Sequence, residues 1–196
     1  MLDQLASAGI AQVVLCTGYL GKQVRAALGE VYGRLRLVYS QESSPLGTAG
    51  ALRLALPFFP SDSVLIMNGD SFCPVDLRAF WEWHGAKGAE ATLLVSQAPD
   101  PSPFGWVQLE AGGRVLAFKE KEKSPPPGPR MINAGIYLIK RGLLKMIPPG
   151  RTVSLERDFF PTLLSRKLYG YQCQASLIDI GTPETYAEAE RFLRGN

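Results

Sequence analysis

The 196-residue sequence predicts one domain of the α/β class, with a mostly parallel mixed sheet and a small antiparallel insertion. In the first half of the chain, short apolar runs typical of strands alternate with amphipathic helical patterns, as in βαβ units. In the second half, strand-like runs at residues 106–110 and 114–118 are separated by Ala111, Gly112 and Gly113, which predicts a hairpin. The hairpin is expected to be an insertion, because a further strand of the same sheet follows it.

The helices of the first half are recognised from apolar residues on one face and from residues that begin or end a helix. Leu2, Leu5 and Ala6 share a face, and Gly9 is placed to end that helix. Asp76 is a suitable N-cap for a later helix. The predicted helices occupy residues 2–8, 20–31, 48–56 and 77–84.

The strands of the first half are short and contain few charged residues. Leu35, Leu37 and Tyr39 alternate with other side chains, which predicts a strand with one wetter face. Residues 64–67 are all apolar, which predicts a strand buried on both faces. The predicted strands occupy residues 10–16, 34–39, 64–68 and 92–96.

The C-terminal part of the chain continues with elements whose starts carry caps. Ser154 is an N-cap residue followed by acidic residues in the first turn, where negative charge suits the helix dipole. Thr182 followed by Pro183 predicts another helix start. Residues 124–129 form a stiff, proline-rich surface loop. The predicted order is strand 132–139, helix 140–147, a helix after Ser154, strand 177–180 and a helix from 183 to about 194.

Composition excludes several classes of protein. The chain is 46% hydrophobic and 20% charged, as in a soluble globular protein. Its net charge is only +3, and the basic residues are scattered, so no nucleic-acid partner is expected. No apolar run approaches about 18 residues, so no membrane span is expected. The N-terminus lacks the pattern of a signal peptide, and we therefore expect a cytoplasmic protein.

The cysteines and the histidine suggest structural roles. Cys16, Cys73 and Cys173 are odd in number, far apart in sequence, and lie in or beside apolar runs. This predicts reduced, buried cysteines, and supports neither a zinc site nor a disulfide framework. His84 is the only histidine and follows two tryptophans in a helical pattern, which favours a structural role. No nucleophile motif accompanies it.

The strand at residues 64–67 ends in Asn68, Gly69 and Asp70. Open α/β sheets bind ligands beyond the carboxyl ends of their strands, so Asp70 is a candidate site residue. Gly69 would let a ligand approach the backbone closely. The alternative is an ordinary turn, because Asn-Gly-Asp also suits a turn.

A second strand repeats this arrangement near the C-terminus. Asp179 follows an apolar run and precedes a glycine, in the order Ile178, Asp179, Ile180, Gly181. If both strands belong to one sheet, Asp70 and Asp179 could hold one divalent cation, because Mg²⁺ is usually bound by one or two carboxylates together with substrate phosphates. Phosphoryl or nucleotidyl transfer needs such an ion. The alternative for Asp179 is a turn residue.

Three further stretches are candidate binding segments. Residues 44–52 turn from loop into helix, and Gly47 and Gly50 leave room for a ligand near the helix start; a plain helix entry is the alternative. Lys121 could meet a phosphate, although residues 119–123 also suit a solvated charge run. Residues 133–135 interrupt a strand with an amide and a glycine, which suits either a sugar hydroxyl or a bulge.

Taken together, these stretches carry a family resemblance. In order along the chain the motifs are Gly9-Ile10, Thr17-Gly18-Tyr19, residues 45–52 (PLGTAGAL), Asn68-Gly69-Asp70, Phe104-Gly105, residues 118–121 (FKEK), residues 132–137 (INAGIY), Ser154-Leu155-Glu156 and residues 178–183 (IDIGTP). The chain resembles the sugar-phosphate nucleotidylyltransferases, and most closely the small bacterial branch that includes mannose-1-phosphate and heptose-1-phosphate guanylyltransferases. Each motif is weak alone, but the ordered series is specific to this superfamily.

The resemblance implies a Rossmann-like nucleotidyltransferase fold, a GT-A-like three-layer sandwich. It also implies a reaction in nucleotide-sugar and polysaccharide biosynthesis. A nucleoside triphosphate, with GTP favoured, and a sugar 1-phosphate give a nucleotide-diphosphate sugar and pyrophosphate. The sugar phosphate oxygen would attack the α-phosphorus directly, without a covalent enzyme intermediate.

The resemblance also implies roles for individual residues. Asp70 and Asp179 would hold Mg²⁺ and, with Lys121, make up the catalytic set. Lys121 would also bind the phosphate of the sugar. The nucleotide would be bound by Gln41, Pro45, Gly47, Thr48, Asn68 and Gly69. The sugar phosphate would be bound by Gly105, Glu120, Lys121, Asn133 and Gly135.

One part of the family pattern is not found in the sequence. The family opens with a first strand, a glycine-rich loop of the form G-G-x-G-T-R-L that wraps the triphosphate, and a Pro-Lys pair. We expect its absence to expose apolar sheet edges and to favour a homodimer. The alternative to an active nucleotidylyltransferase is therefore a catalytically impaired relative that binds a nucleotide, a sugar phosphate or a partner chain.

Overall fold

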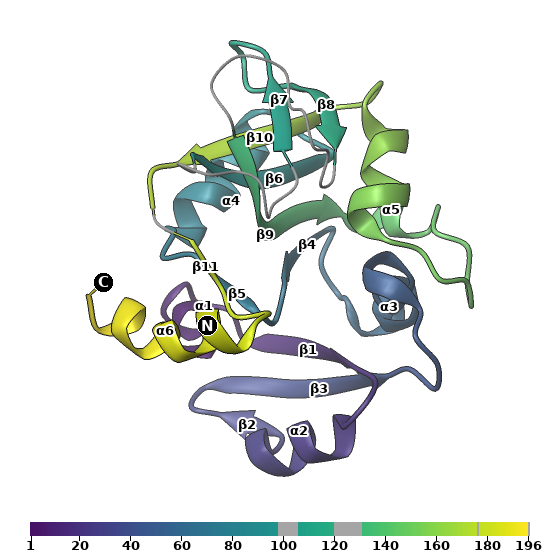
Figure 1. The fold of residues 1–196 in the computed structure, drawn as a ribbon. Helices are drawn as coiled ribbons and strands as arrows, with labels where there is room; N and C mark the ends of the chain where they lie inside the picture. The colour runs from purple at the N-terminus through teal and green to yellow at the C-terminus, as the bar shows by residue number, and fades with distance from the viewer. Residues whose placement is uncertain (98–105, 120–130, 176, 196) are drawn as a thin grey trace. The chain divides into compact units, whose positions relative to one another are not determined.

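The structure is a computed structural model that describes residues 1–97, 106–119, 131–175 and 177–195 (Figure 1). The chain forms two compact units. Unit 1 comprises Met1–Val64 and Lys140–Phe160, and unit 2 comprises Leu65–Ile139 and Pro161–Asn196. Gly105, Glu120, Lys121 and the predicted loop at residues 124–129 lie outside the described residues.

Unit 1 contains a small mixed sheet. Strand β3 lies between β1 and β2, parallel to β1 and antiparallel to β2. A 3-10 helix, Leu56–Phe58, extends α3, and a π-helical turn, Leu155–Phe159, follows Ser154. The elements are α1 (Leu2–Ser7), β1 (Gln12–Thr17), α2 (Gly21–Leu28), β2 (Val31–Tyr32), β3 (Leu35–Gln41), α3 (Gly47–Ala55) and α5 (Arg141–Leu144).

The predicted alternation along β3 is confirmed. Leu35 and Leu37 are buried, whereas Arg36 between them is exposed. The predicted helix at residues 20–31 is too long, because α2 ends at Leu28 and Val31 belongs to β2. The physical reason is Gly29, which follows the helix with φ of +68°, outside the helical region and readily adopted only by glycine.

Unit 2 is built on a larger mixed sheet with the strand order β10-β6-β9-β7-β8, and β4 (Ser63–Met67) also pairs with β9. Strands β10 and β6 are parallel, whereas β9 is antiparallel to β6 and to β7, and β7 is antiparallel to β8. The predicted hairpin is therefore confirmed. The elements are β5 (Ser71–Phe72), α4 (Leu77–Ala86), β6 (Ala91–Gln97), β7 (Trp106–Leu109), β8 (Val115–Lys119), β9 (Met131–Lys140), β10 (Leu168–Cys173), β11 (Ile178–Asp179) and α6 (Pro183–Gly195).

The core of unit 2 lies on β6 and β9. Leu93, Leu94 and Val95 of β6 are fully buried. The caps expected from the sequence are confirmed, since the Asp76 carboxylate accepts hydrogen bonds from two backbone N–H groups of α4. His84 is buried in α4, and its Nδ1 lies 2.7 Å from Thr92 Oγ1, in keeping with a structural role.

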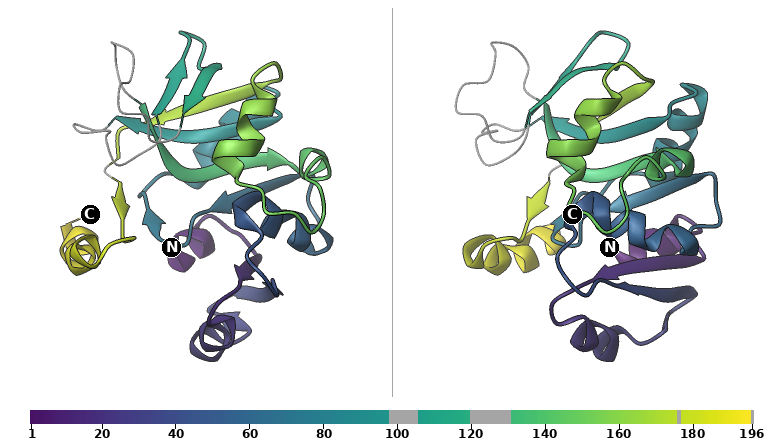
Figure 2. Two further views of the ribbon diagram at one scale, coloured as in Figure 1. Left: turned by 45° about the vertical axis from the view of Figure 1, so that its right-hand side comes forward. Right: turned by 90° about the vertical axis from the view of Figure 1, so that its right-hand side faces the viewer.

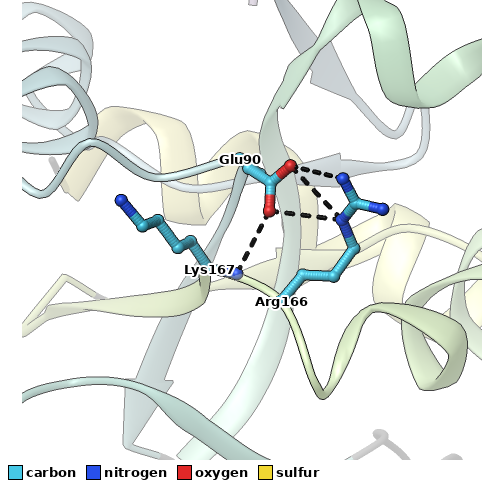
Figure 3. A network of polar contacts seen from close by, with 3 residues as sticks. All are labelled: Glu90, Arg166 and Lys167. Atoms are coloured by element: carbon cyan, nitrogen blue, oxygen red, sulfur yellow. Dashed lines mark hydrogen bonds and ion pairs between the residues drawn. The ribbon is translucent and has the colours of Figure 1, made fainter.

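A polar network joins the starts of the parallel strands β6 and β10 (Figure 3). The Glu90 carboxylate accepts hydrogen bonds from Arg166 Nε at 3.2 Å and Nη2 at 2.6 Å. It also accepts one from the Lys167 backbone N–H at 3.4 Å. The hydrogen bond and the negative charge of Glu90 raise the pKa of Arg166. The network helps to align the first residues of the two strands.

Two expectations about burial are corrected. Strand β4 was predicted to be buried on both faces, but Val64 and Ile66 are buried while Leu65 and Met67 are partly exposed. The cysteines were all predicted to be buried, but Cys16 is exposed and Cys173 is only partly buried. An apolar run shows only that its side chains are hydrophobic, whereas their burial depends on which neighbouring elements cover each face of the strand. Among the described residues, no helix has the length and apolar character needed to cross a bilayer.

Candidate functional site

The backbone segments that bear the two candidate metal-binding carboxylates are joined in unit 2 by a two-stranded ladder. Strands β5 and β11 pair antiparallel, with Asp179 opposite Ser71, and lie side by side in Figure 1. The Ile180 N–H donates to the Asp70 carbonyl oxygen at 2.7 Å, which extends the ladder by one position. Paired strands lie about 5 Å apart, so Asp70 and Asp179 belong to backbone positions about one strand spacing apart. The expectation that the strands before Asp70 and Asp179 share one sheet is wrong, because β4 pairs with β9 in the large sheet whereas β11 pairs with β5 in a separate two-stranded sheet. The two residues are neighbours through β5, a strand of two residues that the sequence does not predict.

The carboxylate of Asp179 is oriented by the turn that follows it. Its Oδ1 accepts a hydrogen bond from the Gly181 N–H at 2.7 Å. A Cβ atom at Gly181 would lie 2.8 Å from the same Oδ1, so a side chain there would push the carboxylate away. The chain then enters α6, the yellow C-terminal helix seen in both views of Figure 2. Thr182 caps this helix by accepting from the Thr185 N–H at 3.2 Å.

Asp70 is exposed and lies in the turn between β4 and β5. Its Oδ1 accepts a hydrogen bond from the Ser71 hydroxyl at 3.4 Å. Because Asp70 precedes β5, the strict alternation of side chains along a strand does not determine the direction of its carboxylate. Within the described part of the chain, neither Asp70 nor Asp179 forms an ion pair with lysine or arginine. Two acidic groups without a basic partner form an electrostatically suitable place for a cation.

The residues expected to bind the sugar meet the end of β4 at a bulge in β9. The register between β6 and β9 shifts between Leu93 and Val95, opposite residues 133–137, so the bulge that the sequence offered as the alternative to a sugar contact is present. Gly135 has φ of +71°, and its carbonyl oxygen accepts from the Asn68 N–H at 2.8 Å. A Cβ atom at Gly135 would lie 3.0 Å from Asn68 Nδ2, so glycine makes room for the asparagine side chain.

Asn133 is held within the same bulge. Its Oδ1 accepts from the Gly135 N–H at 3.2 Å, and its Nδ2 donates to the Tyr137 hydroxyl at 2.7 Å. The structure therefore brings Asn68, Asn133 and Gly135 together, with Asn68 two positions before Asp70. Bulges often re-aim side chains beside active sites, which fits this arrangement.

In unit 1 the glycines of α3 accommodate another part of the same chain. Gly47 has φ of +70°, and a Cβ atom there would lie 2.6 Å from the Val153 carbonyl oxygen. A Cβ atom at Gly50 would lie 2.6 Å from the Arg151 carbonyl oxygen. The Val153 carbonyl oxygen also accepts hydrogen bonds from the Ala49 and Gly50 N–H groups at 2.9 and 3.2 Å. These contacts account for both glycines without a ligand and agree with the helix-entry alternative.

Thr48 connects α3 to the turn after Ser154. Its hydroxyl accepts from the Leu155 N–H at 2.7 Å and lies 3.1 Å from Glu156 Oε2, to which it donates. Ser154 caps the same turn by accepting from the Arg157 N–H at 3.2 Å. The sequence identified Ser154 as a cap but did not reveal that Glu156 reaches Thr48, because these residues are far apart along the chain.

The two remaining predicted nucleotide-binding residues of unit 1 lie between the end of β3 and the start of α3. Gln41 is the exposed last residue of β3, and the Pro45 carbonyl oxygen accepts from the Thr152 hydroxyl at 2.9 Å. Asn68 and Gly69 belong to unit 2. The assignment of these residues to a nucleotide stays a prediction, as does the assignment of Gly105, Glu120 and Lys121 to the sugar phosphate.

The nucleotidyl transferase family profile matches residues 1–196. A mannose-1-phosphate guanylyltransferase from Mycobacterium tuberculosis is 36% identical over 197 residues, which cover 98% of this chain and 54% of that protein. A D-glycero-alpha-D-manno-heptose 1-phosphate guanylyltransferase from Aneurinibacillus thermoaerophilus is 34% identical over 187 residues, covering 95% of this chain and 80% of that protein. The chain thus spans about half the length of the first relative and most of the second.

The fold agrees with a solved structure. The crystal structure of HddC from Yersinia pseudotuberculosis, complexed with GMP-PN, superposes with a TM-score of 0.84 at 24% identity. The match covers 97% of this chain and 83% of that one. The predicted α/β nucleotidyltransferase fold is thereby confirmed. From the family profile and the relatives, the chain belongs to the nucleotidyl transferase family, among the sugar-phosphate nucleotidylyltransferases.

Proposed function

We propose that this chain carries a nucleotidylyltransferase activity that makes a nucleotide-diphosphate sugar from a nucleoside triphosphate and a sugar 1-phosphate, with release of pyrophosphate. The observation that carries the proposal is the β5–β11 ladder, which joins the segments bearing Asp70 and Asp179. The membership of this chain in the nucleotidyl transferase family also supports this reaction. The names of both relatives favour GTP as the nucleotide and mannose 1-phosphate or a heptose 1-phosphate as the sugar.

Mg²⁺ is the proposed metal, and the residues present fit it. The donor set consists of the Asp70 and Asp179 carboxylates, whose backbone segments are joined by the β5–β11 ladder. This suits Mg²⁺, which is commonly held by one or two carboxylates together with substrate phosphates. When bound, Mg²⁺ would neutralise phosphate charge and align the reacting groups.

Residues of this chain would hold the metal, the nucleotide and the sugar phosphate in the proposed reaction. Asp70 and Asp179 would hold the metal, and the Gly181 N–H keeps the Asp179 carboxylate in one orientation. The bulge of β9 would present Asn133 and Gly135 to the sugar, while Glu120 and Gly105 would contribute further sugar contacts. Lys121 would bind the sugar phosphate as a point charge. The resemblance assigns nucleotide binding to Gln41, Pro45, Gly47 and Thr48 of unit 1 and to Asn68 and Gly69 of unit 2, and each of these roles stays a prediction.

The first test is pyrophosphate release by the full chain with Mg²⁺, each nucleoside triphosphate in turn, and mannose 1-phosphate or heptose 1-phosphate. Release should require one sugar and be fastest with GTP. Asp70→Asn and Asp179→Asn should each lower kcat/KM by about 100-fold or more, because charge neutralisation in the site is lost. Asp62→Asn removes an exposed carboxylate outside the site and serves as the matched control. A folded protein that releases no pyrophosphate with any pair of substrates would contradict the proposal.

We also propose that the protein acts in the cytoplasm, in nucleotide-sugar and polysaccharide biosynthesis.

We further propose that the protein forms a homodimer. Support for the dimer comes from β1, which pairs with β3 along one edge while no described strand pairs with the other. Val13, Val14 and Leu15 of β1 are only partly buried. Val14→Lys should weaken association, because charges on edge strands oppose pairing. Analytical ultracentrifugation at several protein concentrations would measure the weaker association of the variant. A wild-type protein that is monomeric at every concentration would contradict the dimer.

A further inference from the structure

Two thiols from distant parts of the chain meet in unit 2. Cys73 follows β5 directly, and Cys173 is the last residue of β10. Although 100 positions separate them, their Sγ atoms lie 3.7 Å apart, within S–H···S hydrogen-bond distance. A disulfide bond has an S–S distance of about 2.05 Å, so side-chain rotation need bring the sulfurs only about 1.7 Å closer.

The two thiols differ in access to solvent. Cys73 is fully buried, whereas Cys173 is only partly buried. The thiolate, not the thiol, attacks an oxidant, and the attacking sulfur must be reachable. Cys173 is therefore the sulfur that a dissolved oxidant meets first, and Cys73 lies behind it.

The hydrogen bond between the two sulfurs shifts the pKa values of Cys73 and Cys173 in opposite directions. Either thiol can donate in the hydrogen bond between the two sulfurs. With Cys73 as the donor the pKa of Cys173 is lowered, and the Ala175 backbone and the Ser96 side chain lower it further, whereas burial opposes this shift. The same S–H donation, together with burial, raises the pKa of Cys73. Negative charge is thus favoured on the accessible sulfur, and the proton stays on the buried one.

We propose that Cys73 and Cys173 form a redox modification site, in which a peroxide oxidises the pair to an intramolecular disulfide. The Cys173 thiolate attacks one oxygen of hydrogen peroxide, the O–O bond breaks, and the hydroxide that leaves takes a proton to become water. Cys173 is then a sulfenic acid. The Cys73 sulfur attacks the Cys173 sulfur, the S–O bond breaks, and the departing hydroxide takes the Cys73 proton. Overall, two thiols lose two electrons and two protons, and one peroxide becomes two waters.

The bond would connect the segments that flank the β5–β11 ladder. Cys73 lies just after β5, and the chain from Cys173 leads into β11. Oxidation would therefore restrain this part of unit 2 in addition to the backbone hydrogen bonds. Formation of the disulfide does not depend on the proposed nucleotidyl transfer.

The test is carried out on the full reduced chain, treated with a small excess of hydrogen peroxide and then with N-ethylmaleimide in denaturant, which exposes every remaining thiol. Each cysteine lies in its own tryptic peptide, residues 1–22, 54–78 and 168–191. Non-reducing mass spectrometry should show peptide 54–78 joined to 168–191, with a loss of two hydrogens, while peptide 1–22 carries N-ethylmaleimide. Dithiothreitol should reverse the link, and Cys16→Ser should form it at the wild-type rate.

Two variants test the order of events. In Cys73→Ser, oxidation should stop at a sulfenic acid on Cys173 that dimedone captures. In Cys173→Ser, Cys73 should stay reduced under the same peroxide dose, because it is buried. The proposal would be overturned if wild-type peptide 1–22 were oxidised while the other two stayed reduced. It would also be overturned if Cys73 were oxidised equally fast in wild type and in Cys173→Ser.

Discussion

At the scale of single residues, Gly135 determines how Asn68 fits beside β9. Its φ of +71° is unfavourable for other residues, and a Cβ atom would meet Asn68 Nδ2 at 3.0 Å and Asn68 Cβ at 3.2 Å. Gly135→Ala should destabilise the protein by about 1–3 kcal/mol, because the backbone is strained and the asparagine must move. Urea denaturation measures the change.

Gly85→Ala is the control for this prediction. Gly85 lies in α4, has no positive φ, and has open space where a Cβ would be placed. Alanine there should leave stability unchanged or raise it by up to about 1 kcal/mol, since alanine favours helix. Equal destabilisation by the two substitutions would contradict the role assigned to Gly135.

Cys16 provides a prediction about pH at the same scale. The residue is exposed overall, but its sulfur lies against α3 and donates to the Ala51 carbonyl oxygen at 3.8 Å. Burial of the sulfur, and then the charge of Glu42, raise the pKa of Cys16 to about 11. The reactive thiolate is therefore scarce at neutral pH and increases until the pH passes that value.

The measurement is the rate of iodoacetamide alkylation in a variant carrying Cys73→Ser and Cys173→Ser. The rate near pH 8 should be roughly a hundredfold below that of a free cysteine, and should still be rising above pH 9.5. A rate that levels off below pH 9 would show that the thiol is not protected in this way.

At the scale of elements, α4 depends on the cap that the sequence predicts. Asp76 Oδ1 accepts from the Arg78 N–H at 2.9 Å and from the Ala79 N–H at 3.1 Å. Asp76→Ala should lower stability by about 1 kcal/mol, because the first N–H groups of the helix lose their acceptor. The urea midpoint should fall with an unchanged slope. Asp76→Asn, which preserves an acceptor, should retain most of the stability, and equal losses in both variants would argue against capping.

Strand β10 is the longest of the strands that the sequence does not predict, the others being the two-residue strands β2 and β5. Residues 168–173 contain Gly170, which weakens a strand signal, between Tyr169 and Tyr171. Their role becomes visible only with their partners, since Trp83 of α4 packs edge-on against both tyrosines, with ring centroids 6.0 and 5.4 Å apart. Alternating aromatic residues were the signal that could have identified this strand.

At the scale of the whole molecule, the large sheet of unit 2 includes a strand, β10, from the C-terminal part of the chain. Strand β10 pairs with β6 from Leu168 opposite Ala91 to Cys173 opposite Ser96, and Leu168 is fully buried. Deleting residues 161–196 should therefore unfold unit 2, because β6 loses a neighbour and its apolar contacts. Deleting only residues 177–196 should preserve the β6–β9–β10 core but abolish pyrophosphate release, because Asp179 is lost.

Near-ultraviolet circular dichroism distinguishes the two deletions. The aromatic signal of Trp83 with Tyr169 and Tyr171 should persist in the shorter deletion and disappear in the longer one. Loss of this signal in both proteins would mean that β11 and α6 are needed for the core of unit 2.

The sequence by itself determined the local elements and the chemistry at their ends. The two-residue hydrophobic period identified the alternation of β3, and capping residues identified the start of α4 at Asp76 and the start of α6 at Thr182. These features are predictable because each signal lies within a few neighbouring residues. The carboxylates after two apolar runs were recognisable for the same reason. The tertiary structure alone decided that Asp179 lies opposite Ser71 and that the Sγ atoms of Cys73 and Cys173 are in contact. It also decided that the Val153 carbonyl oxygen accepts hydrogen bonds from N–H groups at the start of α3. These contacts join residues about 100 positions apart, and their register depends on the packing of the intervening chain, which no local pattern contains.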